Sequence, residues 1–232
     1  TKQNEFVPKI MDHIAPFLSL RAGDRVAIKI NLSGAKEIYA NTHYETVESL
    51  IHTLRERFGA GPISVVEGSD GAFFSAKTTW DIFYKFKYKE VEMLGAQLCN
   101  LDELPHDQTL EIETVSGPQS VQFCRFPADY LVSVVPATSH NIFPVSLSVP
   151  NLVGFVKPEQ RVLMFGASAQ EMKRINFSQS EKYFQLVSFA NRNFVALLKQ
   201  IPPSLVLIDG LYGMEGKGPI KGSPVFHGFA IA

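Results

Sequence analysis

Several apolar, strand-like runs of this sequence end in polar residues of types that could do chemistry. In open α/β sheets, ligands bind beyond the carboxyl ends of the parallel strands, where the connecting loops converge. A strand end is also where a chain meets water, and that explains any single one of these residues. A shared polar site explains the group better, because the runs are strongly apolar and the loops after them are rich in Gly and Pro. The residues concerned are Lys29, Asn31, Glu67, His140 and Asp209.

Two of these residues are candidates for proton transfer, and one is a candidate for holding negative charge. We predict Glu67 or His140 as the general acid or base, since both side-chain types transfer protons when their surroundings tune the pKa. We predict that Lys29 helps to hold an anionic group. His43 and His140 also have a plain structural interpretation, because an isolated histidine is more often a hydrogen-bonded structural residue than a ligand or base.

The stretch 209–224, DGLYGMEGKGPIKGSP, has five glycines and two prolines and follows an apolar run. Glycine weakens regular structure, so the stretch predicts an ordered loop over 210–222 with glycines at positive φ. A P-loop is excluded, because Pro219 stands where the lysine is required, and the dinucleotide-binding G-x-G-x-x-G spacing is absent too. A backbone cradle for another anion fits the composition, with Lys217 or Lys221 assisting.

Parallel strands connected through helices carry all their carboxyl ends on one edge of the sheet. We therefore predict that four residues distant in sequence approach one another around a single cleft. They are Lys29, Glu67, His140 and Glu215. The plainer alternative is that Lys29 and Glu67 form only an ion pair between neighbouring strands.

The composition is that of a globular protein and argues against several functions. Of 232 residues, 45% are hydrophobic and 19% charged, with a formal net charge of -1, which argues against binding to nucleic acid or a membrane surface. No apolar stretch is long enough to span a bilayer, and TKQNEF is no signal peptide. The sequence starts without Met and stops within a strand-like run, so we interpret it as an excerpt of a longer chain.

Cysteine usage bounds the redox chemistry of the chain. Cys99 and Cys124 are the only cysteines, and two thiolates cannot supply the usual four ligands of an iron–sulfur cluster. We therefore expect no such cluster to be held by this chain alone. Two cysteines outside any C-x-x-C pair suit a reducing compartment, and we expect a cytoplasmic location.

The hydrophobic pattern predicts strands that alternate with helices. Helices are predicted over 6–18, from a capping box at Thr42 and Glu45 to Leu54, over 78–94 and over 180–199. Strands are predicted over 25–32, 62–67, 96–102, 129–136 and 204–210, with a hairpin of 109–115 and 120–126 around SGPQ. We predict an α/β fold, a single three-layer domain over 1–232 with a mostly parallel or mixed sheet and an antiparallel hairpin.

The order of several motifs resembles the DUF362 family, which is named only as a domain of unknown function. These motifs are VAIKINL, NTHYETVESLIHTL, ISVVEGSDG, PADYLVSVVP, SHNIF, PNLVGF and LVLIDGLYGMEGKGPIKGSP. The last is the most specific, and the resemblance covers nearly the whole chain. It implies site residues at Lys29, Asn31, Thr42, His43, Glu67, Gly68, Asp129, Pro136, His140, Asn151, Gly154, Asp209, Gly210, Met214, Glu215, Gly216, Lys217 and Gly218.

The chain departs from the family pattern where the family carries lysines. The family has P-K-x-K-T-H where this chain has Pro136-Ala-Thr-Ser-His140, and L-K-N-L where it has Val149-Pro-Asn-Leu152. Three missing cations put a shared anionic substrate in doubt. A weaker likeness, in strand order and in a histidine after the strand 129–136, is to the N-terminal domain of nickel-pincer lactate racemases.

The family is sometimes joined to ferredoxin-type iron–sulfur modules, so the resemblance implies a role in redox or metal-cofactor metabolism. The first hypothesis is an enzyme-type domain with a pocket for a small anion or a metal at the strand ends. The alternative is a non-catalytic module that docks a metal centre or a ferredoxin-like partner, and a third is a structural relic without an active pocket. A catalytic pocket should bury a carboxyl or histidine with a shifted pKa, whereas a docking module should expose an apolar patch.

Overall fold

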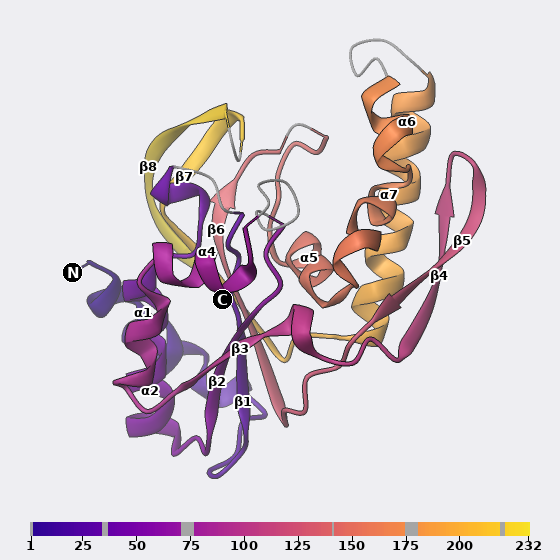
Figure 1. The fold of residues 1–232 in the computed structure, drawn as a ribbon. Helices are drawn as coiled ribbons and strands as arrows, with labels where there is room; N and C mark the ends of the chain where they lie inside the picture. Colours follow the sequence, from indigo (N-terminus) through magenta and orange to yellow (C-terminus); the bar gives the residue numbers. More distant parts are fainter. Residues whose placement is uncertain (1, 34–36, 71–76, 141, 175–180, 219–220) are drawn as a thin grey trace.

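The computed structural model describes residues 2–33, 37–70, 77–140, 142–174, 181–218 and 221–232. A six-stranded sheet forms its middle layer, in the order β3-β2-β1-β6-β7-β8 (Figure 1). The strands are β1 (Val26–Lys29), β2 (Ile63–Glu67), β3 (Gln97–Asn100), β6 (Tyr130–Thr138), β7 (Leu205–Lys217) and β8 (Lys221–Ile231). All neighbours pair in parallel except β7 and β8, which are antiparallel. The predicted α/β class with a mostly parallel sheet is confirmed.

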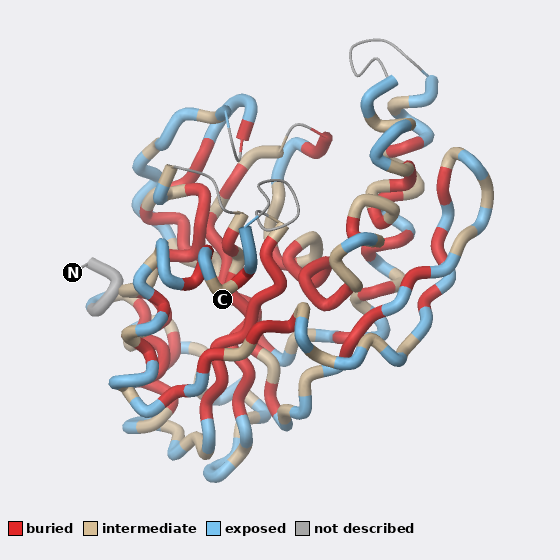
Figure 2. Tube along the Cα trace, in the orientation of Figure 1, coloured by how far each residue is buried: buried red, intermediate tan, exposed pale blue. Residues whose placement is uncertain are grey.

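Helices cover both faces of this sheet, because alternate strand residues point to opposite sides. Val26 and Ile28 pack with helices α1 (Lys2–Ile14), α2 (Tyr44–Phe58) and α4 (Thr79–Lys85). Ala27 and Val66 pack into a second core, which includes residues of α7 (Glu181–Gln200) and of the hairpin β4 (Gln108–Thr114) and β5 (Gly117–Phe123). Figure 2 shows the central strands buried between these layers. Burial on both faces explains why the strands are continuous apolar runs.

The second face also carries several short helical segments in the region where prolines interrupt the sequence. These are α5 (Ser148–Asn151), the 3-10 helices η5 (Leu152–Phe155) and η6 (Pro158–Phe165), and α6 (Ala169–Arg174). They bring the segment after β6 back over the carboxyl end of the sheet. Asn151 and Gly154 reach the strand ends in this way.

Three local predictions were wrong in detail. Thr42 does not cap helix α2, because His43 is the N-cap residue and the hydroxyl of Thr42 bonds elsewhere. The predicted helix 78–94 breaks after α4, where Lys87 has φ 64°, and continues as the 3-10 helix η3 (Tyr88–Glu92). The hairpin turns at 115–116 instead of at SGPQ, because Thr114 already pairs with Gly117.

The glycine-rich stretch is mostly strand, so the predicted loop over 210–222 is wrong. Strand β7 continues through the stretch to Lys217, which pairs with Lys221, the first residue of β8. Residues 219–220 lie outside the described part of the chain. Among the described glycines of this stretch, only Gly216 has a positive φ, 77°. The others allow close approach: a Cβ on Gly213 would clash with the carbonyl oxygen of Ala137, and one on Gly210 with the ring of Phe229.

Candidate functional site

Lys29 and Glu67 form a buried ion pair at the carboxyl ends of β1 and β2. The two strands are parallel neighbours, and Lys29 Nζ lies 2.6 Å from Glu67 Oε1. The side chains are 1% and 3% exposed. The sequence-based alternative of an ion pair between neighbouring strands therefore describes these two residues correctly.

Every polar hydrogen of the Lys29 ammonium group is engaged within the protein. Nζ donates to the carbonyl oxygen of Ile30 at 2.6 Å, to Glu67, and to Asn151 Oδ1 at 2.9 Å. An ammonium group has three donors, so none remains for a ligand in this arrangement. The predicted role of Lys29 as an anion-binding residue would require one of these bonds to break.

Glu67 is likewise held by several donors. Its Oε1 accepts from the amide of Gly68 and its Oε2 from the amide of Leu32, both at 2.8 Å. Burial raises the pKa of Glu67 and lowers that of Lys29, while their mutual attraction opposes both shifts. The surrounding amide donors favour the carboxylate, so the pair is a rigid, desolvated support beneath the strand ends.

Two glycines let the polypeptide close tightly over this pair. A Cβ on Gly154 would lie 2.8 Å from Lys29 Cε, and one on Gly68 would clash with the carbonyl oxygen of Gly154. Asn151, one turn earlier, donates from Nδ2 to Ser133 Oγ at 3.0 Å. The implied site residues Gly68, Asn151 and Gly154 thus come together around Lys29.

Arg161 is a buried charge that sequence reasoning missed. Its guanidinium group donates to the carbonyl oxygens of Ser69 and Gly154 and forms an ion pair with Asp102. Nothing in its local sequence marks it, because its partners are backbone carbonyl groups and the carboxylate of Asp102, which lies distant in sequence. A cavity of about 260 Å³ adjoins this group, with Arg161, Asp102, Lys77, Thr79, Asn100 and Glu103 among its lining residues.

His43 and Asp209 form a second buried pair, at the start of α2 and on β7. His43 Nδ1 lies 3.4 Å from Asp209 Oδ2, and both residues are buried. The same carboxylate accepts from Thr46 Oγ1 at 2.5 Å and from the amide of Leu211 at 3.1 Å. Sequence analysis named His43 and Asp209 but missed Thr46, which lies one helical turn after His43. This arrangement fixes the orientation of the imidazole ring.

Asn31 and Thr42 fasten the loop between them to the sheet. The amide of Asn31 donates to Thr42 Oγ1 at 2.8 Å, and the amide of Thr42 donates back to the carbonyl oxygen of Asn31. Thr42 Oγ1 also donates to the carbonyl oxygen of Val134 on β6 at 2.8 Å. Their hydrogen bonds position His43 next to Asp209.

His140 lies in an aromatic cluster. Its ring stacks on Phe165 with centroids 5.8 Å apart and lies 5.5 Å from the ring of Phe143. Its Nδ1 accepts from the amide of Ile142 at 3.1 Å, and burial lowers its pKa to about 4. The ring is therefore neutral near pH 7, with its proton on Nε2.

The hairpin residues named from the sequence lie on exposed parts of β7 and beside the loop that carries His140. Glu215 is 61% exposed at its side chain and lies 3.8 Å from His227 Nε2. The amide of Gly218 donates to Ser139 Oγ at 3.3 Å, so this end of the hairpin contacts the residue before His140. Gly216 and Lys217 are exposed.

Of the four residues predicted to share a single cleft, only two are in direct contact in the described part of the chain. Lys29 and Glu67 meet, but among the described residues no hydrogen bond or ion pair joins either of them to His140 or Glu215. The residues instead form three groups: Lys29–Glu67–Asn151, His43–Thr46–Asp209, and His140 with its aromatic neighbours. Their convergence around one ligand stays a prediction.

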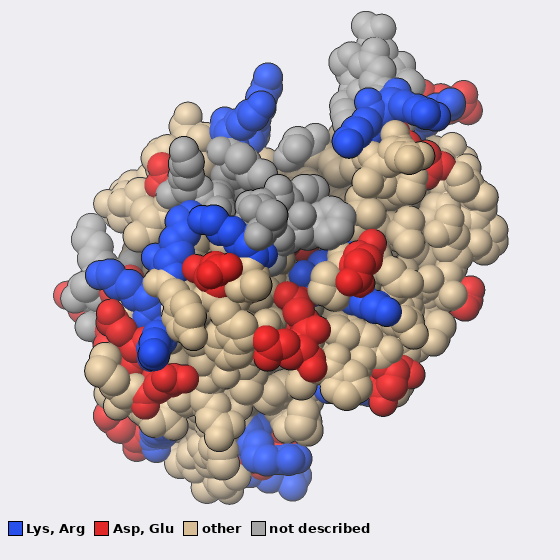
Figure 3. All heavy atoms as spheres, in the orientation of Figure 1, with Lys and Arg blue, Asp and Glu red and all other residues tan. Residues whose placement is uncertain are grey.

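Charge and side-chain grouping bear on the possible ligands. Acidic and basic side chains are interspersed over the described part of the face seen in Figure 3. Within the described ranges, no three His, Cys, Asp or Glu side chains gather into a group that could hold a metal ion. The described side chains therefore do not fit a metal held by the protein itself. No helix in the described part of the chain is long and apolar enough to cross a membrane.

These features define an α/β domain with buried polar groups at the carboxyl edge of a mostly parallel sheet. The chain belongs to the DUF362 family, since the family model "Domain of unknown function (DUF362)" matches residues 26–232. No protein of curated function matches the sequence.

The fold is similar to that of the lactate racemase apoprotein from Thermoanaerobacterium thermosaccharolyticum, with a TM-score of 0.59 and 12% sequence identity. The match covers 92% of this chain and 49% of the racemase chain, so this chain spans about half of its length. At this identity the likeness concerns the fold alone.

Proposed function

We propose that the chain is an enzyme-type domain that binds a small carboxylate at the carboxyl edge of the sheet and transfers a proton there. The observation that carries this is the His43–Asp209 pair, 3.4 Å apart and buried where parallel strands end. A carboxylate beside one ring nitrogen of a histidine favours the proton on that nitrogen, which leaves the other nitrogen to act as an acceptor. His43 would accept a proton from the bound ligand and return it.

The other predicted catalytic residues take distinct parts in this proposal. His140 is neutral near pH 7 and carries its proton on Nε2, so it would donate a hydrogen bond or a proton to the ligand. The engaged hydrogen bonds of Glu67 and Lys29 favour a positioning role beneath the site over direct contact with the ligand. Asn31 and Thr42 would hold His43, while Glu215, Gly216, Lys217 and Gly218 would line the ligand from the hairpin.

The ligand class rests on fold analogy together with the polar edge. The racemase named by the fold comparison acts on lactate, and we carry a short 2-hydroxycarboxylate to this chain as the proposed substrate class. A role in redox or metal-cofactor metabolism, a cytoplasmic location and a ferredoxin-like partner belong to the same proposal. They are supported only by the family resemblance and by the two free cysteines.

Calorimetric titration with L-lactate, D-lactate and glycolate tests the proposal. We expect wild-type protein to bind at least one of them, and His43→Gln to bind it about tenfold more weakly or not at all, because the group aimed at the ligand is altered. His52→Gln is the matched control, since His52 lies exposed on the helix that His43 caps, and in the described part of the chain it pairs with Glu56. Absence of binding by the wild type, or equal binding by His43→Gln, would contradict the proposal.

A docking module remains the second candidate, because edge strand β8 exposes apolar side chains. Phe226 is 50% exposed, Phe229 40% and Ile231 53%. An exposed apolar row on an edge strand is typical of an interaction surface. Line broadening of β8 amide signals by a [4Fe–4S] ferredoxin, lost in Ile231→Ser, would favour this function over the first.

A further inference from the structure

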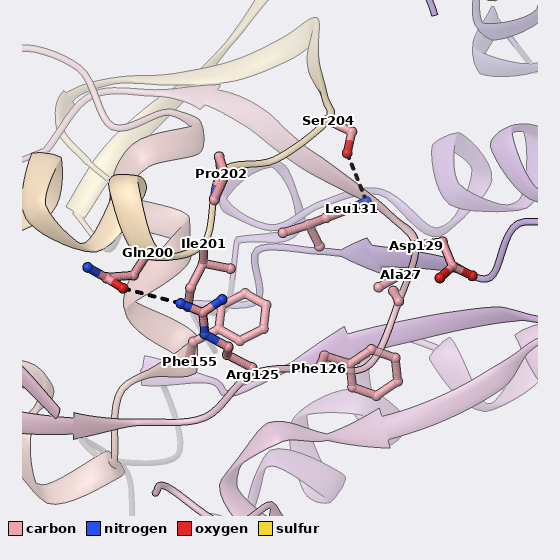
Figure 4. Close-up of a pocket in the computed structure, with 11 residues that line it drawn as sticks. Ala27, Arg125, Phe126, Asp129, Leu131, Phe155, Gln200, Ile201, Pro202 and Ser204 are labelled. Carbon is pink, nitrogen blue, oxygen red and sulfur yellow. Dashed lines mark hydrogen bonds between the residues drawn. The ribbon is translucent and has the colours of Figure 1, made fainter. Parts of the chain in front are cut away.

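A second concave site lies at the opposite end of the sheet from the candidate residues. It is a cavity of about 170 Å³ lined by residues at the start of β1, by those before and at the start of β6 and β7, by the end of α7 and by Phe155 (Figure 4). Ala27 and Leu131 are each the second residue of their strand, and Ser204 directly precedes β7. The proposed function does not use this site.

The floor of the cavity is apolar. Ala27 and Phe155 close the cavity from beneath and are fully buried, while Phe126, Leu131 and Pro202 present apolar surface to it. An apolar cavity of about 150 Å³ is enough to bind benzene. The space at the amino edge therefore matches a six-membered ring or a branched aliphatic group of similar size.

The rim carries one cation whose charge is not balanced by a carboxylate. Within the described part of the chain, the only hydrogen bond of Arg125 is from Nη2 to Gln200 Oε1, at 3.2 Å. Gln200 is neutral, so the guanidinium group keeps both its charge and most of its donors. Figure 4 shows Arg125 and Gln200 together on one side of the cavity.

The one carboxylate on the rim, Asp129, is already neutralised. It accepts from Arg25 Nε at 2.9 Å and from Arg25 Nη2 at 2.8 Å, and it also accepts from the amide of Arg25. In Figure 4 it lies across the cavity from Arg125. Its charge is therefore paired outside the cavity and does not compete for the Arg125 guanidinium group.

We propose that this cavity binds a small monocarboxylate with an aromatic or branched apolar body. The body would lie on Phe126, Leu131 and Pro202, and the carboxylate would take the free donors of Arg125 in the bidentate geometry that a guanidinium group offers. The amide of Gln200 would donate to the second carboxylate oxygen once its oxygen is held by Arg125.

Benzoate is the probe, and the amide NMR spectrum of the whole chain is the readout. We expect saturable shifts of the Arg125, Leu131 and Ser204 signals with the wild type. Arg125→Gln should raise the dissociation constant about tenfold or more, as loss of a charge-assisted hydrogen bond does. Arg174→Gln, which removes an exposed arginine from α6, should leave the dissociation constant unchanged.

Two further arms keep the proposal falsifiable. Benzyl alcohol has the same ring without the charge, and we expect it to bind the wild type about tenfold more weakly. Gln200→Leu, an exposed change that leaves Arg125 in place, should weaken benzoate by less than Arg125→Gln does. The proposal is overturned if benzoate causes no saturable shifts at these residues, if Arg125→Gln binds as tightly as the wild type, or if benzyl alcohol binds as tightly as benzoate.

Discussion

The two ends of strand β1 each carry an ion pair to a neighbouring strand or its flank, and the two pairs differ sharply in burial. At the carboxyl end, Lys29 and Glu67 lie 2.6 Å apart and are 1% and 3% exposed. At the amino end, Arg25 and Asp129 lie 2.8 Å apart and are 55% and 44% exposed. Similar separations of the charged groups therefore occur in two very different dielectric surroundings.

This difference teaches what each pair contributes. Two charges in water gain little from pairing, because solvent screens them and the long side chains lose freedom. Buried charges depend on each other and on the surrounding hydrogen bonds, since either one alone would be left without solvation. Removing one charge should therefore destabilise the fold strongly at the carboxyl end and weakly at the amino end.

The largest effect is expected from breaking the buried pair. Glu67→Ala leaves the Lys29 ammonium group buried beside Asn151 without its carboxylate, and we expect a loss of about 3–5 kcal/mol in the free energy of unfolding. Urea denaturation of the variant and the wild type measures this.

Two controls place that result within the comparison. Asp129→Ala breaks the exposed pair and should change the urea midpoint far less. Lys29→Met combined with Glu67→Leu removes both charges and should cost less than Glu67→Ala alone. Similar losses for Glu67→Ala and Asp129→Ala would show that burial does not distinguish the two ends.

A smaller effect is expected from the glycines of strand β7. Gly213→Ala would force a methyl group against the carbonyl oxygen of Ala137, and we expect a loss of about 1–3 kcal/mol or more. Gly216→Ala has open space around it, and only its φ of 77° opposes the change, so about 1 kcal/mol is expected. Thermal unfolding of both variants shows which one loses more stability. A larger loss for Gly216→Ala would mean that positive φ, and not close strand packing, is the main reason for glycine in this stretch.

These glycines also mark where sequence reasoning stopped. The apolar runs ending at Lys29, Glu67 and Asp209 predicted the strands and their shared edge, because burial on both faces leaves a pattern in the sequence itself. The role of Gly213 depends on a strand about 75 residues away, Ala137 and its neighbours, so composition suggested a loop instead.

Contacts with backbone groups could not be predicted from the sequence either, because their partners also lie far away along the chain. Arg161 is satisfied mainly by carbonyl oxygens of Ser69 and Gly154, and no residue type announces a carbonyl oxygen. The family motif supplied Asn151 and Gly154, whose roles around Lys29 became clear only from distances. The family motifs therefore indicated that Asn151 and Gly154 belong near Lys29, but not which contacts they make there.

A further effect depends on pH and concerns His140, which is only partly buried. Burial lowers its folded-state pKa to about 4 from 6.5, so between these values the unfolded chain binds a proton that the folded chain does not. Stability contributed by the neutral ring is therefore lost as the pH falls through this window. Urea denaturation at about pH 7 and about pH 5 should show a larger loss for the wild type than for His140→Gln. Equal losses would mean that His140 is as solvated as in the unfolded chain.

The central claim is that the two ends of the sheet bind different ligands. One measurement addresses it directly: amide NMR spectra of the wild type titrated with lactate and, separately, with benzoate. The account predicts that lactate shifts the signals of His43, Thr46 and Leu211, whereas benzoate shifts those of Arg125, Leu131 and Ser204. The claim would be contradicted if both ligands shifted the same set of signals, or if lactate left the carboxyl-end signals unchanged at saturation.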